Sequence, residues 1–460
     1  MKLTEVYIDG FRNIKNTRLD FSAEPMIVLL APNSFGKSNL LLGIKFGFDL
    51  ISKQGTQVKK HIQDSDTYAD WNAEGKHTFT FGVKFWENDK QGNLGRYTYQ
   101  YSLECTLEAK SSCGDDKGQG LSRVVSHRIS DEFLRFATEA EVDVDEKTEG
   151  HTRFERSEKE INVLLPNGTR RSIINVKYNT CDDFVFNLGL HKLGYMDVIG
   201  ELDAGDEIRT ILQEISAVLR DLTVENFGDI ICDERSDYLA HGFLSQDAVK
   251  IYKRNKDVYY YFVEEFKNLF QHYCHDKDKE KGVELISLGD SGQYQLIFHD
   301  NRKEKKEMIR TISYGTRRVF KLLSQIISNE SPLISLEDIE LGLHQELYAK
   351  VVHVLLRVLD NNKYFRKTKE QRRHEPRLII TSHAPGIVNA FGSNLDSIYL
   401  PVPPMDSEDL GGARFAKLSQ AGKDELNDKK YLNYYDKGNI IFGLFFDQDR
   451  RDELRKWLEI

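Results

Sequence analysis

The sequence predicts a mixed α/β protein whose α/β core is divided between the two ends of the chain. Before about residue 80 and after about residue 280, short apolar runs interleave with helix-like segments, as in α/β domains. From about Thr78 to Asn175 the residues alternate in hydrophobicity, which indicates an antiparallel β part. Asp182 to about His275 has helix-like spacing instead, which predicts a largely helical insertion.

The composition argues against several classes of protein. The chain has 460 residues, 40% of them hydrophobic, enough for two or three domains with sizeable cores. A formal net charge of -9 is not that of a generic nucleic-acid binder. The first residues do not read as a signal peptide, no stretch is apolar enough to span a membrane, and the five cysteines are scattered. We therefore expect a reduced, cytoplasmic protein without a membrane partner.

The stretch "LLAPNSFGKSNLL", residues 29–41, ends like a phosphate-binding loop. It follows three expected strands, Leu3–Ile8, Thr17–Phe21 and the apolar run Met26–Leu30, and it precedes apolar residues at helical spacing. A loop between a buried strand and a helix is the context that the pattern G-x-x-x-x-G-K-[ST] requires. The first glycine of that pattern is replaced here by Ala31.

Strand pairs are expected in both parts of the chain. Aromatic and apolar residues alternate in two runs, which predicts strands with one buried face. Two further hairpins are expected where turn residues separate apolar runs. The alternating residues are Phe79, Phe81, Val83, Phe85, Tyr97, Tyr99 and Tyr101, and the turns are Pro166-Asn167-Gly168 and Asp290-Ser291-Gly292.

Three stretches of the second half add groups that bind anions or metal ions. In "RTISYGTRRVFKLL", Ser313 opens a helix-like run, so a hydroxyl and free backbone N–H groups form an anion site. In "SPLISLEDIELGLHQE", the run Leu333–Leu336 ends in Glu337 and Asp338, which can hold Mg²⁺ and polarise water. In "RLIITSHAPGIVNAF", His383 follows another apolar run and can reach a γ-phosphate. Taken singly, these features also fit a Ser N-cap, a solvated acidic loop and a surface histidine.

Together, the order of these features closely resembles ABC-type ATPases, in particular the branch with SMC, RecF and OLD-family proteins. "VYIDGFRNIKNTRLDF" resembles the opening hairpin of that branch, "ELGLHQ" its segment after Walker B, and "TSHAP" its switch-histidine segment. The resemblance covers about residues 1–55 and 305–400. It implies an ABC-type ATPase head with split N- and C-terminal lobes.

The resemblance implies that ATP and Mg²⁺ are bound, and it gives each motif a role. It implies that Glu337 is the Walker B acid, Asp338 the general base and His383 the switch histidine, and that Ser38 and Glu337 hold Mg²⁺. The signature segment would cap the nucleotide of a second subunit in a head-to-tail dimer. Its residues are Ser313, Tyr314, Gly315 and Thr316. The implied nucleotide-binding residues are Arg12, Ala31, Pro32, Asn33, Ser34, Phe35, Gly36, Lys37, Ser38 and Asn39.

The chain departs from the family pattern in ways that bear on its rate. Ala31 is acceptable if its φ is negative, because a methyl group clashes only in left-handed conformations. Asp338 is one methylene shorter than the usual glutamate, and a displacement of ~1 Å can lower a rate ~10²-fold. We therefore expect good ATP binding and slow hydrolysis. The other departures are Ser34 and Phe35 in place of a small pair, and the lack of a clear Q-loop glutamine, for which Gln63 is a guess.

Four segments are expected along the chain. Residues 1–76 are the N-terminal ATPase lobe with the phosphate loop, and 77–180 are a β-rich segment of the head. Residues 181–281 are a helical insertion for partner or trigger recognition, and 282–460 are the C-terminal lobe with signature, Walker B and switch histidine. The insertion's aromatic run, Tyr259 to Phe262, is more typical of a core than of a partner surface.

The end of the chain bears on the partner. Only 77 residues follow His383, too few for the TOPRIM nuclease domain of OLD-family proteins. The chain therefore resembles stand-alone ATPase subunits of bacterial anti-phage systems, first that of PARIS with its TOPRIM nuclease, then that of Septu with its HNH nuclease. We expect a sensor and scaffold that controls a separately encoded nuclease effector and answers to a phage-encoded trigger.

Two alternatives stay open. The first is a RecF-like repair or recombination ATPase that clamps DNA. Arg357–Arg377, with eight Lys or Arg against three acids, would be its nucleic-acid contact, although a solvated loop has the same composition. The second is an interaction protein whose nucleotide site is structural.

Overall fold

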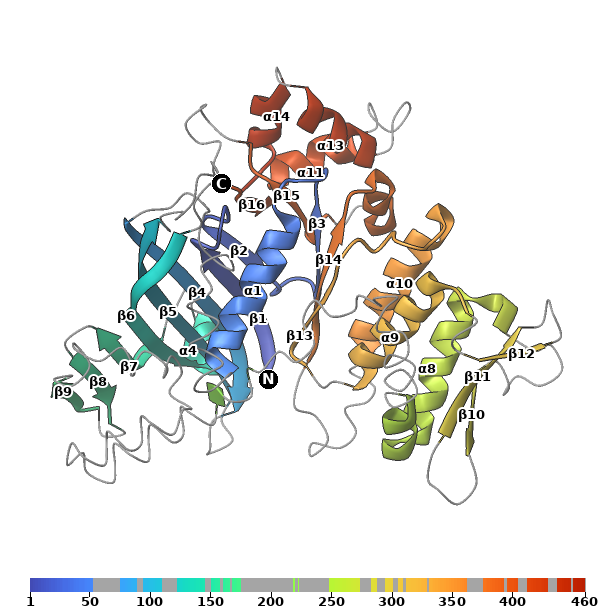
Figure 1. Ribbon diagram of the computed structural model, residues 1–460, viewed down its shortest axis with the longest axis horizontal. Coiled ribbons are helices and arrows are strands. Elements are labelled where there is room, and N and C mark those ends of the chain that lie inside the picture. The colour runs from blue at the N-terminus through green and yellow to red at the C-terminus, as the bar shows by residue number, and fades with distance from the viewer. Residues whose placement is uncertain are drawn as a thin grey trace, which may run out of the picture. The chain divides into compact units, whose positions relative to one another are not determined.

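The computed structural model describes most of the chain (Figure 1). It describes residues 1–52, 75–88, 94–109, 122–144, 150–157, 160–165, 168–174, 218–219, 222, 248–273, 283–287, 294–300, 305–308, 312–328, 331–361, 375–392, 395–403, 412–428, 437–447 and 450–459.

The chain forms two compact units, each assembled from separate stretches of sequence. The antiparallel unit comprises Met1–Ala23, Ser34–Val224 and Pro404–Ala416. The parallel unit comprises Glu24–Asn33, Glu225–Pro403 and Lys417–Ile460. The units cut across the four expected segments, because the strand before the phosphate loop belongs to one unit and the helix after it to the other. A core divided between both ends of the chain is nevertheless what the fold shows.

A large antiparallel sheet organises the antiparallel unit. The alternation of Phe81 and Val83 with Tyr99 and Tyr101 places these residues on one face, where Phe81 pairs with Tyr101 and Val83 with Tyr99. All four are buried, as expected for a sheet covered on one side. In sheet order the described strands are β2 (Thr17–Asp20), β1 (Lys2–Asp9), β4 (Gly75–Asn88), β5 (Leu94–Ala109), β6 (Ser122–Thr138), β7 (His151–Ser157), β8 (Glu160–Leu164) and β9 (Arg170–Ile174).

Helix α1 (Lys37–Ser52) packs against this sheet through two glycines on one helix face. A Cβ atom on Gly43 would lie 2.4 Å from Cδ1 of Ile8, and one on Gly47 would lie 2.2 Å from the ring of Phe81. The Tyr101 hydroxyl donates a hydrogen bond to the Gly47 carbonyl oxygen, 2.9 Å away. The helix that begins at the phosphate loop is therefore held close to the sheet. A short helix, α4 (Glu139–Val144), follows β6.

The parallel unit is built on a parallel sheet in the order β13, β14, β3 and β15. Every residue of these strands is buried, which is why the strands are rich in apolar residues on both faces. Strand β16 (Phe415–Lys417) lies where the chain passes from the antiparallel to the parallel unit. The bounds are β13 (Leu333–Leu336), β14 (Arg377–Ser382), β3 (Met26–Leu30) and β15 (Ile398–Pro401).

An aromatic core joins helices α8 (Lys256–Leu269) and α9 (Tyr314–Ser328) to a small antiparallel sheet. Phe320 of α9 lies 4.7 Å from Phe262 and 5.2 Å from Phe266 of α8, measured between ring centroids. Within the expected aromatic run, Tyr259 and Phe262 are buried, whereas Tyr260 is 51% exposed. The remaining elements here are α10 (Gln345–Asn361), β10 (Val283–Ser287), β11 (Tyr294–Asp300), β12 (Lys305–Met308) and the 3₁₀ turn η3 (Gln271–Tyr273).

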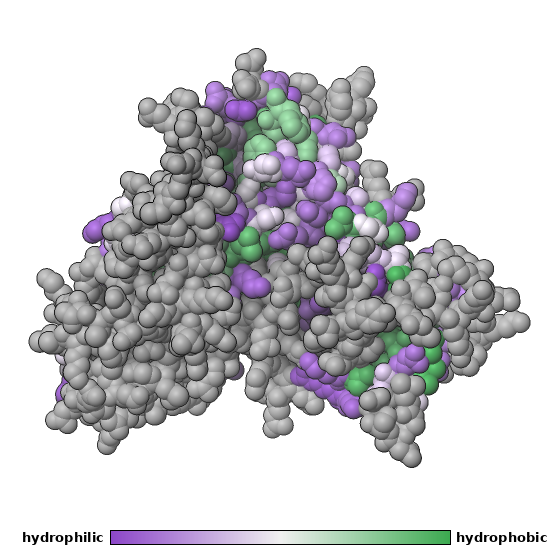
Figure 2. All heavy atoms as spheres, in the orientation of Figure 1, coloured by the Kyte–Doolittle hydropathy of each residue, from purple (hydrophilic) through white to green (hydrophobic). Residues whose placement is uncertain are grey.

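Short helices complete the parallel unit near its end: η8 (Pro385–Phe391), α11 (Gln420–Asn427), α13 (Lys437–Phe446) and α14 (Arg451–Lys456). Figure 2 shows apolar surface over these C-terminal helices, and Phe446 of α13 is 72% exposed. None of the helices among the described residues is long and apolar enough to cross a membrane.

Both expected hairpins are confirmed by pairing, β8 with β9 and β10 with β11. Of their turn residues, Gly168 is described and the others lie outside the described residues, as does Gln63. The middle of the basic stretch, residues 362–374, also lies outside them. At its two ends, Arg377 is buried at the start of β14 and Arg357 forms an ion pair with Glu265.

Candidate functional site

Three neighbouring parallel strands end at one edge of the parallel sheet. Leu336, the last residue of β13, pairs with Ile380 of β14, and Ser382, the last residue of β14, pairs with Leu30 of β3. Because the strands are parallel and aligned in this register, their carboxyl ends lie together. Ligands of open α/β sheets bind outside this edge. The loops that begin here carry the sequence-predicted acids, the histidine and the first half of the phosphate loop.

The phosphate loop leaves β3 through Ala31 and Pro32, both buried. The Ala31 backbone N–H donates to the Ser382 carbonyl oxygen, 3.3 Å away, so the loop begins as a continuation of the sheet. Ala31 is not among the residues with a positive φ. The substitution of alanine for the first glycine of the motif is therefore sterically acceptable.

The second half of the phosphate loop, Ser34 to Ser38, belongs to the antiparallel unit. Ser34 and Gly36 have positive φ values of 68° and 88°, and α1 begins immediately after them at Lys37. Left-handed residues at alternate positions turn successive backbone N–H groups toward one point, which forms a cradle for anions. A Cβ atom on Gly36 would lie 3.0 Å from that of Ala413, so the loop has little room for a larger residue.

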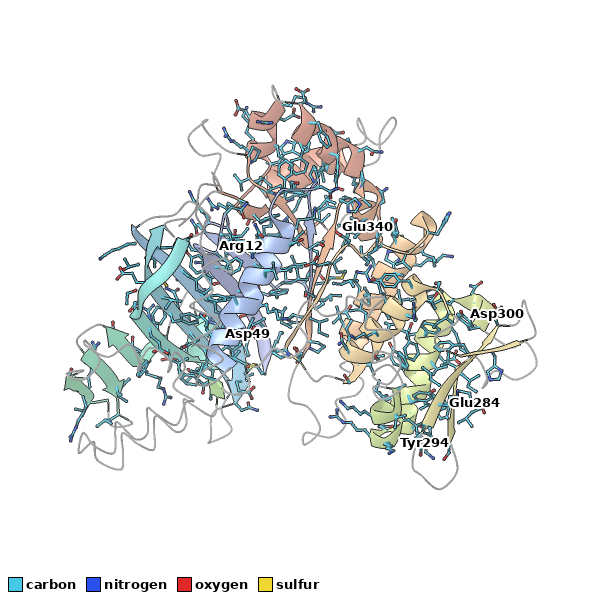
Figure 3. The ribbon with its side chains drawn as sticks, in the orientation of Figure 1. Arg12, Asp49, Glu284, Tyr294, Asp300 and Glu340 are labelled. Carbon is cyan, nitrogen blue, oxygen red and sulfur yellow. The ribbon has the colours of Figure 1, made fainter. Side chains whose placement is uncertain are left out.

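Arg12 ties the loop after β1 to the first turn of α1. Figure 3 labels Arg12. Its guanidinium donates to Oδ1 of Asn39, 2.9 Å away, and Asn39 in turn donates to Oδ1 of Asn13 at 2.7 Å. Arg12 has a positive φ of 51°. Asn39 follows Ser38 in the first turn of α1. Its contact with Arg12 therefore places the Arg12 side chain beside the start of that helix.

The acidic loop follows β13 and begins with Glu337 and Asp338, both half-buried. Asp338 has a positive φ of 45°. Asp and Asn tolerate this left-handed conformation better than longer residues, so the backbone gives a physical reason for an aspartate at position 338 in place of the usual glutamate. The Asp338 N–H donates to Oγ1 of Thr381, 2.9 Å away, and that hydroxyl lies 3.4 Å from Oδ1 of Asp338.

Arg318 of α9 fixes the path of the acidic loop. Its guanidinium donates to the carbonyl oxygens of Asp338 at 3.0 Å and Leu341 at 3.1 Å, and it also donates to that of Glu337. Arg318 is buried. Three carbonyl oxygens accept hydrogen bonds from its two terminal nitrogens, which offsets part of the cost of burying the guanidinium.

The signature residues begin α9 and pack against the same loop. The Thr316 N–H donates to the Ser313 hydroxyl at 3.2 Å, so Ser313 is an N-cap, and the two hydroxyls lie 2.7 Å apart. Gly315 lies against the acidic loop so closely that a Cβ atom there would be 2.2 Å from the Gly342 carbonyl oxygen. Tyr314 lies at the start of α9, 5.7 Å from the Arg318 guanidinium. The signature helix and the acidic loop therefore form one packed assembly.

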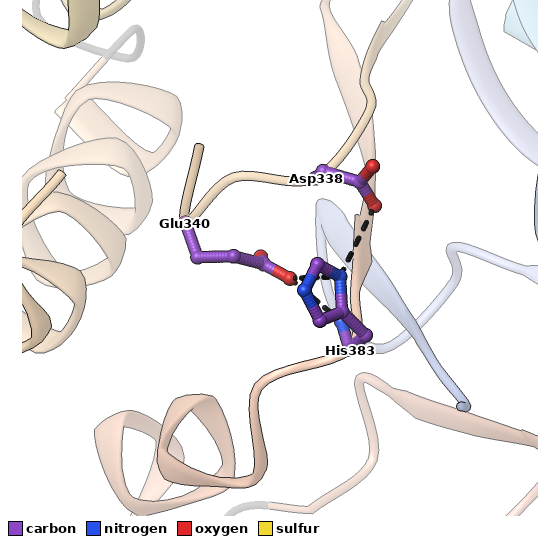
Figure 4. Close-up of side chains that lie close together, drawn as sticks. All are labelled: Asp338, Glu340 and His383. Carbon is purple, nitrogen blue, oxygen red and sulfur yellow. Dashed lines mark hydrogen bonds and ion pairs between the residues drawn. The ribbon is translucent and has the colours of Figure 1, made fainter. Parts of the chain in front are cut away.

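His383 follows β14 and meets two carboxylates of the acidic loop (Figure 4). Its ring Nδ1 lies 2.7 Å from Oε1 of Glu340 and 3.7 Å from Oδ1 of Asp338. The same Glu340 oxygen accepts the His383 backbone N–H at 2.8 Å. The ligand atoms of these three residues lie within 4.8 Å of one another, so they could also hold a metal ion. Burial raises the pKa of Tyr348, and the charge of Glu340 raises it further.

Sequence reasoning missed three residues of this edge: Glu340, Thr381 and Arg318. Glu340 was visible as the third acid after β13, and its interval of two from Asp338 gave no reason to pair it with a histidine 43 residues away. Thr381 and Arg318 act on the backbone of the acidic loop, which no local spacing indicates. Glu337, Asp338, His383 and the first part of the phosphate loop follow strands that end at this one edge.

One family model matches part of the chain. Residues 201–389 match the model described as "AAA domain, putative AbiEii toxin, Type IV TA system". This range contains the signature, the acidic loop and His383, and it excludes the phosphate loop. It supports a nucleotide-hydrolysing ATPase domain. No curated protein matches the chain.

Solved structures similar to the chain include SMC head domains. A head bound to the C-winged helix domain of ScpA is 12% identical with a TM-score of 0.44, over 92% of this chain and 99% of that one. The head domain from Thermotoga maritima is 11% identical with a TM-score of 0.36, over 91% and 100%. An Smc head with an extended coiled coil, bound to the C-terminal domain of ScpA derived from Pyrococcus furiosus, is 12% identical with a TM-score of 0.40, over 92% and 98%.

Proposed function

We propose that this protein binds ATP with Mg²⁺ and hydrolyses it as an ABC-type ATPase. The observation that supports this most is the shared edge of β13, β14 and β3. A phosphate-loop strand, a pair of acids and a histidine leave neighbouring parallel strands at their carboxyl ends. This is the place where α/β sheets bind nucleotides.

The residues fit these ligands. The positive φ values of Ser34 and Gly36 suit backbone N–H groups that receive phosphate oxygens. In this proposal Lys37 contacts the β- and γ-phosphates, and the half-buried Glu337 joins the Ser38 hydroxyl in holding Mg²⁺. The metal, when bound, neutralises charge that develops on the phosphates. Asp338 accepts a proton from the attacking water, and His383 donates to the γ-phosphate.

The active unit in this proposal is a head-to-tail dimer. Ser313 to Thr316 would cap the nucleotide of a second copy with a hydroxyl and helix N-terminal N–H groups. The exposed Ser313 at the start of α9 is in keeping with such a contact. Arg12 is included at the nucleotide because its partner Asn39 lies in the first turn of α1.

Hydrolysis is proposed to be slow. Asp338 is short, and its left-handed backbone is anchored by Thr381 and Arg318, so the carboxylate has little freedom to approach the water. Such a protein would spend most of its time with ATP bound, as a switch or clamp does. Turnover is expected below ~10 s⁻¹, the median for enzymes.

We further propose a cytoplasmic role in bacterial anti-phage defence. The protein would be the sensor and scaffold that restrains a separately encoded nuclease effector, such as a TOPRIM protein, until a phage-encoded trigger appears. The description of the matched family names a putative toxin of a Type IV TA system, which is in keeping with a role in controlling a toxic effector.

The test uses the purified full-length chain, with nucleotide binding and phosphate release measured side by side. We expect saturable ATP binding, turnover that requires Mg²⁺, and a doubling of mass with ATP when Asp338→Asn blocks hydrolysis. No affinity for ATP would disprove the whole proposal. Turnover well above ~10 s⁻¹ would disprove the slow-switch part alone. The defence role is tested by purification from the native host, where a nuclease should accompany the chain.

A further inference from the structure

We propose that Glu340 is a positioning residue that holds His383 for its contact with the γ-phosphate, an inference that rests on the proposed ATPase function. Glu340 comes from the acidic loop and His383 from the end of β14. Glu340 is the first residue of the segment "ELGLHQ" after the Walker B pair, and none of the roles implied by the resemblance falls on it.

One oxygen of Glu340 makes both contacts with His383. Oε1 accepts the backbone N–H at 2.8 Å and lies 2.7 Å from Nδ1 of the ring. The contact with the N–H fixes the position of the His383 backbone, and the contact with Nδ1 fixes the side-chain torsions of its ring. A ring without the second contact could rotate about its side-chain torsions, since its side chain is 45% exposed.

Burial distinguishes Glu340 from its neighbour Asp338. Glu340 is 8% exposed, and its Oε2 has no hydrogen-bond partner among the described residues. A buried carboxylate with an unsatisfied oxygen destabilises a fold. The unsatisfied oxygen offsets the stability that the backbone hydrogen bond from His383 contributes, so orientation of the His383 ring is the role that we assign to this glutamate.

The contact has a chemical consequence for the ring. With Nδ1–H donated to Glu340, Nε2 is the nitrogen left to face a ligand. Glu340 would thus set the orientation of the ring and the nitrogen that faces the phosphate. Groups that orient a functional histidine in this way typically matter 10–100-fold, as judged roughly from metal-site partners.

The test is a double-mutant cycle on ATP turnover with Glu340→Ala, His383→Ala and the double variant. We expect Glu340→Ala to lower kcat about 10–100-fold while KM stays nearly constant, because the residue acts through a positioned group. In the His383→Ala background, Glu340→Ala should lower kcat no further. Glu340→Gln keeps an oxygen that can accept both hydrogen bonds, so it should recover much of the kcat that Glu340→Ala loses.

Glu265 offers a matched control. It is a buried glutamate of the same unit, and it forms an ion pair with Arg357 of α10, which does not belong to the acidic loop. Glu265→Gln should leave kcat unchanged at temperatures where the variant is folded. Equal losses from Glu340→Ala with and without His383 would overturn the positioning role, as would a rise in KM without a fall in kcat. If the wild-type chain hydrolyses no ATP, the proposed function fails first and this inference falls with it.

Discussion

The phosphate loop and the acidic loop follow strands of the same parallel sheet, yet their shapes are held in different ways. The phosphate loop depends on its own backbone, with left-handed residues at Ser34 and Gly36 and a helix that starts at Lys37. The acidic loop depends on distant residues, since Arg318 and Thr381 are 20 and 43 positions away from Asp338. The shape of a loop held by its own residues can be predicted from local sequence, whereas the shape of a loop held by distant residues cannot.

The largest effect is expected at the locally shaped loop. Lys37→Ala should lower ATP affinity about 100-fold and abolish turnover, because hydrogen bonds from a charged group contribute about 1.5–3 kcal/mol each. Titration with a fluorescent ATP analogue measures the affinity. Lys45→Ala removes the same charge from the same helix and should bind ATP normally. Retained affinity in Lys37→Ala would mean that the loop does not bind phosphate.

The next effect separates charge from backbone in the acidic loop. Asn tolerates the left-handed conformation of Asp338, so Asp338→Asn should keep the fold and ATP binding but lower turnover about 10²-fold, as loss of a general base does. Phosphate release measures this directly. Asp338→Glu lengthens the side chain and should raise turnover, with a loss of stability of about 1 kcal/mol from the positive φ. Normal turnover in Asp338→Asn would rule Asp338 out as the base.

A smaller effect is expected where the signature helix meets the acidic loop. Gly315→Ala places a methyl group against the Gly342 carbonyl oxygen and should lower the free energy of unfolding by about 2–3 kcal/mol. Denaturant unfolding measures this free energy. Gly443, inside α13, has nothing within 4 Å of an added Cβ, so Gly443→Ala should stabilise the protein by about 0.5–1 kcal/mol. Equal responses of the two glycines would contradict the close packing at Gly315.

The smallest effect concerns the hydroxyl that anchors Asp338. Thr381→Val has nearly the same shape but no acceptor for the Asp338 N–H, so stability should fall by about 1–2 kcal/mol and turnover should fall with it. Thermal unfolding measures the stability, and phosphate release measures the turnover. Thr381→Ser keeps the hydroxyl and should lie closer to the wild type. If Val and Ser behave alike, the hydroxyl has no part in holding the loop.

Much of the fold could be predicted from the sequence because its signals are local. The alternation around Val83 and Tyr99 predicted strands with one buried face, and the apolar runs before Ala31, Glu337 and His383 predicted buried strands. The order of the strands in the parallel sheet follows from no local pattern, because β3 lies more than 300 residues before β13 and β14 in the chain. The expected roles of the individual site residues stay predictions.

The candidate site divides in the same way. The residues that meet ligand in the proposal were found because their types and spacing are typical of phosphate and Mg²⁺ chemistry. Glu340 could not be paired with His383 from the sequence, since the contact exists only when β14 lies beside β13. Arg318 was hidden for a similar reason, because its partners are carbonyl oxygens, which every residue has.

The two glycines of α1 have a consequence for genetic screens. Gly43 and Gly47 face the antiparallel sheet at distances that leave no space for any side chain. A larger residue at either position would push away the helix that begins at Lys37. A random mutagenesis screen for loss of activity should therefore return substitutions at Gly43 and Gly47 alongside those at Lys37. On a map of tolerated substitutions, this side of α1 would look as restricted as a binding surface although it touches only the interior.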